Sequence, residues 1–163
     1  MKTLIIMRHG KSSWKDKKMK DIDRPLKKRG HKDAQQMGTL LCEQELVPQK
    51  ILCSPAKRTR QTAEELVDKC NFGGEVDYID SLYMPESSII MDLVASLPDE
   101  LERVMVIGHN PGLEGLVQIL SGEVESLSTA AVAHLVLPIK SWAEISKEVN
   151  GNLVQIYRPK ELK

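Results

Sequence analysis

The sequence is poor in cysteine, and its three cysteines lie far apart. Cys42, Cys53 and Cys70 form no CxxC pair, and their odd number cannot be fully paired within one chain. This pattern argues against a disulfide framework and predicts reduced, mostly buried thiols in a cytoplasmic protein. The four histidines are scattered, with no carboxylate–histidine cluster at metal-ligand spacing. We therefore expect neither a metal nor another cofactor.

Long apolar runs and a surplus of charge are also missing. No segment approaches the roughly 20 apolar residues that cross a bilayer. Lys2 is followed by only a short apolar run, so no signal peptide is expected at this point. Lysine plus arginine and aspartate plus glutamate each number 23, which gives a net charge of zero. We expect no membrane partner and no nucleic-acid partner, because non-specific nucleic-acid binding usually needs a basic surplus.

The chain does contain short apolar runs that alternate with helical stripes of apolar residues. Strands are expected at 4–7, 51–53, 76–79, 104–107, 131–137 and 153–157, and helices at about 28–45, 54–69, 87–97 and 111–121. Polar residues typical of helix caps occur at three of the helix starts, in Ser54-Pro55, Ser87-Ser88 and Asn110-Pro111. The alternation predicts one α/β domain over residues 1–163, a three-layer α/β/α fold with a mostly parallel sheet. The last two strands have no long helix between them and are expected to pair antiparallel.

Candidate chemistry follows three of these strands directly. Arg8 and His9 come after the first strand, Arg58 lies in the first turn after the second, and His109 follows the run 104–107. The carboxyl ends of parallel strands meet at one edge, so these four side chains are expected to converge. Arginine offers a planar fork of donors that matches phosphoryl oxygens. The pattern predicts a phosphoryl site in which His9 is the nucleophile, because a neutral imidazole can attack phosphorus.

The ordered set of motifs resembles the histidine phosphatase superfamily, also called phosphoglycerate mutase-like. The motifs that carry the resemblance are Arg8-His9-Gly10, Ser54-Pro55-Ala56-Lys57-Arg58 and Gly108-His109. Stretches 8–14, 21–30, 108–112 and 157–162 are further similar to SixA-like phosphohistidine phosphatases, which usually carry alanine at the place of Gly10. The resemblance implies the compact form of the fold, with His9 as phospho-acceptor, Arg8 and Arg58 as phosphate ligands, and His109 as oxyanion stabiliser.

Further residues are predicted to contact the substrate. Ser12, Lys15, Arg24 and Asn110 are assigned to substrate binding. The lysines at 15, 17, 18 and 20 most simply form a solvated loop, and docking of an acidic protein is a less favoured interpretation.

One departure from the wider superfamily carries chemical information. Met84 stands where mutases and many broad phosphatases carry a glutamate acid, and Glu86 is two residues out of register. General acid catalysis contributes about 10²–10⁴-fold when the leaving group needs a proton. An imidazole leaving group, with a pKa of about 6.5, does not need a strong acid.

The sequence therefore predicts hydrolysis of phosphohistidine on a phosphotransfer or carrier protein, with release of inorganic phosphate. Two alternatives stay open. One is a broad small-molecule phosphomonoesterase in which Glu86 or a loop carboxylate is the acid. The other is a non-catalytic phosphate-binding regulatory module.

Overall fold

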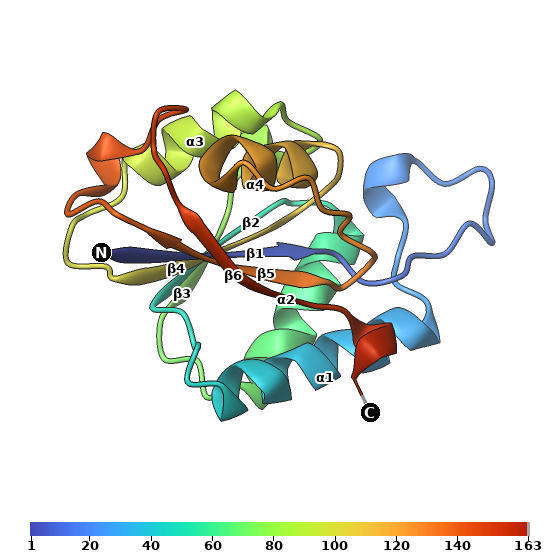
Figure 1. Cartoon of the computed structure of the whole chain (residues 1–163). Helices are drawn as coiled ribbons and strands as arrows, with labels where there is room; N and C mark the ends of the chain where they lie inside the picture. The colour runs from blue at the N-terminus through green and yellow to red at the C-terminus, as the bar shows by residue number, and fades with distance from the viewer. Residues whose placement is uncertain (163) are drawn as a thin grey trace.

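The apolar runs form one mixed sheet, which a computed structural model describes for residues 1–162 (Figure 1). The strand order is β3-β2-β4-β1-β5-β6. The strands are β1 (Lys2–Arg8), β2 (Lys50–Cys53), β3 (Glu75–Tyr78), β4 (Arg103–Gly108), β5 (Val132–Leu137) and β6 (Asn152–Tyr157).

Four neighbouring strands of this sheet are parallel. β1 pairs with β4, and β2 pairs with both β4 and β3. β5 runs antiparallel to β1, and β6 antiparallel to β5, so β6 points in the same direction as β1. The predicted mostly parallel sheet with an antiparallel final pair is confirmed. The carboxyl ends of β1, β2 and β4 lie side by side at one edge.

Helices cover both faces of the sheet (Figure 1). They are α1 (Lys28–Glu43), α2 (Lys57–Lys69), α3 (Ser87–Ala95) and α4 (Gly112–Ser121), with short 3₁₀ turns η1 (Asp21–Asp23), η2 (Asp80–Leu82), η3 (Trp142–Glu144) and η4 (Pro159–Glu161). Ile5 and Met7 belong to the core under α1 and α2, whereas Leu4 and Ile6 belong to the core under α3 and α4. Because both faces of β1 are buried, every position from 4 to 7 is apolar. The predicted three-layer fold is confirmed.

The three capping predictions are wrong. None of the N-cap residues of α2, α3 and α4 makes a side-chain cap, and the helices begin at Lys57, Ser87 and Gly112. At each of the three positions, one polar side chain has a tertiary partner. Ser87, for example, donates its hydroxyl to the carbonyl of Gly112 at 2.7 Å. Such a contact joins α3 to α4 and cannot be inferred from local sequence.

The cysteines agree with the prediction of unpaired, mostly buried thiols. Cys42, Cys53 and Cys70 are free thiols, and the last two are buried. Burial raises the pKa of the Cys53 thiol to about 12, so it stays protonated. Within residues 1–162, no helix has the length and apolar character needed to cross a membrane.

Candidate active site

A cleft of about 640 Å³ opens at the carboxyl ends of the central strands. β1 ends at Arg8 and β4 at Gly108, which places His9 and His109 on neighbouring strand ends. Their ring centroids are 5.4 Å apart. Arg58 reaches the same cleft from the first turn of α2. The structure thus brings together the four residues that the sequence singled out.

His9 is held in one orientation and in one protonation state. Its backbone N–H donates to the carbonyl of Gly108 at 3.1 Å, and its carbonyl accepts from Ala130 at 2.8 Å. Its Nδ1 lies 2.6 Å from the carbonyl oxygen of Gly10. A carbonyl only accepts, so Nδ1 carries the proton and Nε2 keeps a free lone pair. Burial, reinforced by the charge of Arg58, lowers the pKa of His9 to about 4.

Two arginines flank this imidazole. Arg58 is only 3% exposed, and it donates from Nη1 to the carbonyl of Asp21 at 2.7 Å and from Nη2 to its carboxylate at 3.0 Å. Arg8 donates from Nη1 to the carbonyl of Leu127 at 3.1 Å. The Nε atoms of both arginines are buried without a hydrogen-bond partner in residues 1–162. Both arginines line the cleft, and their positive charge suits a phosphoryl dianion.

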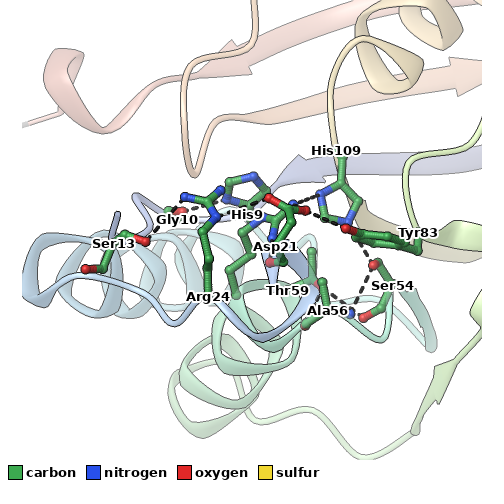
Figure 2. Close-up of polar contacts among 11 residues, drawn as sticks. His9, Gly10, Ser13, Asp21, Arg24, Ser54, Ala56, Thr59, Tyr83 and His109 are labelled. Atoms are coloured by element: carbon green, nitrogen blue, oxygen red, sulfur yellow. Dashed lines mark hydrogen bonds and ion pairs between the residues drawn. The ribbon is translucent and has the colours of Figure 1, made fainter. Parts of the chain in front are cut away.

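His109 is connected to both Arg58 and Ser54. Its Nδ1 lies 3.4 Å from Nη2 of Arg58. Its Nε2 lies 2.8 Å from the hydroxyl of Ser54 (Figure 2). Because arginine only donates, Nδ1 accepts and Nε2–H donates to Ser54. Burial and the charge of Arg58 lower the pKa of His109 to about 3. Both imidazoles are therefore neutral near pH 7.

Asp21 and Tyr83 belong to the site, although the sequence did not point to them. The Asp21 carboxylate accepts from Nε of Arg24 at 3.1 Å and from the Tyr83 hydroxyl at 2.5 Å (Figure 2). It also accepts from Arg58. Its partial burial favours the neutral form, but hydrogen bonds from Tyr83 and Arg58 lower its pKa to about 2. The only local sign of the Asp21–Arg24 ion pair in the sequence is that the two residues lie three positions apart in a charged stretch. Tyr83 packs its ring edgewise on His109, with centroids 5.6 Å apart.

The remaining predicted residues divide between the cleft and its surroundings. Ser12, Arg24 and Asn110 line the cleft, whereas Lys15 lies in a neighbouring hollow. Arg24 is 6% exposed and stacks beneath Trp14, with its guanidinium carbon 3.4 Å from the ring centroid. The Asn110 amide donates to the carbonyl of Leu127 at 2.9 Å and to the Glu114 carboxylate at 3.0 Å, which replaces the predicted cap.

The cleft contains little that could act as an acid or a metal site. Met84 lines it, and Glu86 does not. Across residues 1–162, no group of three or more His, Cys, Asp or Glu side chains could hold a metal ion.

Comparisons with known proteins give the class to which this cleft belongs. Residues 4–82 match the model of the histidine phosphatase superfamily (branch 1). An uncharacterised chloroplastic protein of Arabidopsis thaliana is 34% identical over 151 residues, which cover 86% of this chain and 69% of that protein. The chain belongs to the histidine phosphatase superfamily, and it is a phosphatase of the hydrolase class.

Within that superfamily the chain is SixA-like. The phosphohistidine phosphatase SixA of Escherichia coli is 28% identical over 138 residues, which cover 82% of this chain and 84% of that protein. A solved structure of the protein histidine phosphatase SixA complexed with tungstate superimposes with a TM-score of 0.85 at 27% identity, covering 99% of both chains. A SixA protein from Agrobacterium tumefaciens has a TM-score of 0.84 at 27% identity, covering 97% of this chain and 98% of that one.

Proposed function

We propose that the protein is a phosphohistidine phosphatase that acts on phosphorylated protein histidines through a phosphoenzyme at His9. The observation that carries the proposal is the absence of a usable acid among the described residues that line the cleft. Asp21 is the one carboxyl group there, and with a pKa of about 2 and an ion pair to Arg58 it stays ionised. Phosphomonoesters need a proton on their leaving oxygen. The histidine of a phosphohistidine, in contrast, can leave as a neutral imidazole.

In the first step, the Nε2 lone pair of His9 attacks phosphorus. A P–N bond to His9 forms while the P–N bond to the substrate imidazole breaks, and that imidazole leaves with the bonding electrons. Protonation of its other ring nitrogen, near pH 6.5, makes the leaving group neutral. The hydrogen bond from Nδ1 to Gly10 fixes the attacking ring in the productive tautomer.

Arg8, Arg58 and His109 stabilise the charge on the transferring oxygens. When a phosphoryl group draws Arg58 toward itself, Nδ1 of His109 loses its donor. Ser54 can then donate to Nε2, because a hydroxyl both donates and accepts, and Nδ1–H becomes available to a phosphoryl oxygen. In the second step, water attacks the phosphorus of phospho-His9, so that a P–O bond forms while the P–Nε2 bond breaks and its electron pair returns to Nε2. The proton lost by water goes to the phosphate, which leaves as inorganic phosphate, and His9 is again the neutral imidazole with its proton on Nδ1.

The comparisons support this substrate class. The Escherichia coli relative is a phosphohistidine phosphatase, and the superimposed SixA structure binds tungstate, a tetrahedral oxyanion like phosphate. We propose that the reaction needs no metal, because Arg8 and Arg58 supply the positive charge. We also propose a cytoplasmic setting, because the three cysteines are free.

The test compares kcat/KM for a phosphohistidine carrier domain with kcat/KM for phosphoserine and sugar phosphates. We expect a preference of about 10² or more for the phosphohistidine protein, unchanged by EDTA. An acid-labile phosphoryl label trapped on the wild type should be absent from His9→Ala, and turnover should be lost.

His134→Ala is the matched control, because His134 lies on β5 and does not line the cleft. It should retain both label and turnover. Faster cleavage of monoesters than of phosphohistidine would instead assign a broad phosphomonoesterase. Phosphate binding without any turnover would assign a regulatory module.

A further inference from the structure

Basic residues are concentrated in one short part of a chain that has no net charge. Residues 11–32 contain ten lysines and arginines against three aspartates, a net charge of +7. The rest of the chain therefore carries −7. We call residues 11–32 the basic rim. All the lysines in it are exposed. The segregation of charge creates a positive surface on a neutral protein.

The basic rim borders the mouth of the cleft. The segment projects beyond the carboxyl ends of the strands, as Figure 1 shows for the light-blue loop that carries η1. Its base is closed by backbone hydrogen bonds from Ser13 to Pro25 and from Lys27 to Lys11, each 2.8 Å. Lys11 and Lys27 line the cleft itself. A substrate that enters the cleft therefore passes along this surface.

The lysines of the basic rim have no internal partners. Arg29 pairs with Asp33, and Arg24 pairs with Asp21. None of the eight lysines in the segment has a carboxylate within 4.0 Å among residues 1–162. Because no carboxylate in the described part of the chain pairs with these lysines, their positive charge is available to a partner.

Trp14 gives this surface an aromatic centre. Its side chain is 68% exposed, although it is stacked on the buried Arg24. It lines both the cleft and an adjoining hollow of about 580 Å³ that also contains Lys15 and Lys28. Exposed tryptophans surrounded by polar contacts are typical centres of protein–protein interfaces.

We propose that the basic rim and Trp14 form a docking surface for an acidic segment next to the phosphohistidine of the substrate protein. The proposal rests on the proposed function. Once the phosphorylated imidazole is in the cleft, the residues that flank it lie over Lys11, Trp14 and Lys27. Acidic flanks complement this surface and speed association, whereas neutral flanks gain nothing from it.

The experiment uses two synthetic peptides with a central phosphohistidine, one flanked by glutamate and aspartate and one by serine and glycine. For the wild type we expect kcat/KM to be about 10-fold higher for the acidic peptide, with the preference falling as NaCl is raised to 0.5 M. The variant Lys17→Glu/Lys28→Glu should lose this preference. It should retain wild-type kcat/KM on the neutral peptide, because neither residue lines the cleft.

Lys140→Glu/Lys147→Glu is the control with the same change of charge. Lys140 and Lys147 are exposed and follow β5 at the end of the sheet opposite the cleft. This control should keep the preference for the acidic peptide. If both double variants behave alike, or if the wild type cleaves the two peptides equally, the docking surface is overturned.

The remaining outcomes separate this proposal from others. Failure of the wild type to cleave either peptide would overturn the proposed function itself. Binding of the basic rim to phosphatidylserine vesicles or to single-stranded DNA, removed by Lys17→Glu/Lys28→Glu while the two peptides are cleaved equally, would assign the surface to a membrane or a nucleic acid instead.

Discussion

At the scale of single residues, the Asp21 carboxylate reduces the positive charge that an incoming phosphoryl group meets in the cleft. It pairs with both Arg58 and Arg24, and it lines the same cleft. Two effects compete: it orients Arg58, and it repels a dianion. Because Arg58 is also held by the backbone carbonyl of Asp21, we expect repulsion to be the larger effect.

The variant Asp21→Asn should therefore bind inorganic phosphate more tightly, by roughly 3- to 10-fold. Product inhibition measures this directly. Asp23→Asn is the control, because Asp23 lies on the same 3₁₀ turn but does not line the cleft. Weaker phosphate binding in Asp21→Asn would show that orientation of Arg58 is the dominant role.

Met84 is the second residue whose side chain affects which substrate is cleaved, because it stands where a general acid could act. It lines the cleft and is 51% exposed. Met84→Glu places a protonatable group there, so we expect phosphomonoester hydrolysis to rise by about 10-fold or more while phosphohistidine turnover stays the same. Steady-state kinetics on both substrate types checks this. An equal gain on both substrates would contradict the explanation based on the leaving group.

At the scale of elements, the start of α1 packs against the end of β1 through two glycines. A Cβ on Gly30 would lie 2.3 Å from the carbonyl oxygen of Lys11, and one on Gly10 would lie 2.7 Å from the carbonyl oxygen of Gly30. A glycine near a helix start weakens a sequence-based helix assignment. Here the glycine is required, because the helix backbone comes so close to the segment that carries His9.

We expect Gly30→Ala to lower the free energy of unfolding by about 1–3 kcal/mol, because the backbone must move to relieve the clash. Urea denaturation measures the change. Gly73→Ala is the control, because a Cβ there would have no neighbour within 4 Å. If Gly30→Ala and the wild type have the same free energy of unfolding, the start of α1 and the segment after β1 can move apart without loss of stability, which would contradict this prediction.

Sequence reasoning succeeded where a residue's position follows from its own strand. Arg8, His9 and His109 each follow a short apolar run, and parallel strands carry such residues to one edge. It missed the pair of Asp21 and Tyr83, whose hydrogen bond spans 62 residues. It misassigned Ser54 as a helix cap, because its hydroxyl bonds His109 on another strand end. Contacts that depend on packing between elements leave no local pattern.

At the scale of the whole molecule, the two buried imidazoles make stability depend on pH. The pKa of His9 is lowered to about 4 and that of His109 to about 3, while an unfolded histidine titrates near 6.5. Between these values the unfolded chain binds more protons, so stability is complete above pH 6.5 and falls as the pH decreases.

We expect a loss of roughly 2 kcal/mol per histidine at pH 5 relative to pH 7. Urea unfolding at both pH values in phosphate-free buffer measures this loss. The variant His9→Gln/His109→Gln should show a clearly smaller change. An identical loss in the variant would place the acid sensitivity in other groups.

The directions of the strands also place the start of β1 and the end of β6 at opposite ends of the sheet. Lys2 begins β1 beside Leu137, a full seven-residue strand from the cleft, or roughly 20 Å. β6 ends at Tyr157 opposite Val132, on the same side as His9. A fluorescent reporter or a surface tether joined at the amino end would therefore leave the cleft accessible to a large substrate. The same attachment after β6 would begin at the rim of the cleft and compete with that substrate for space.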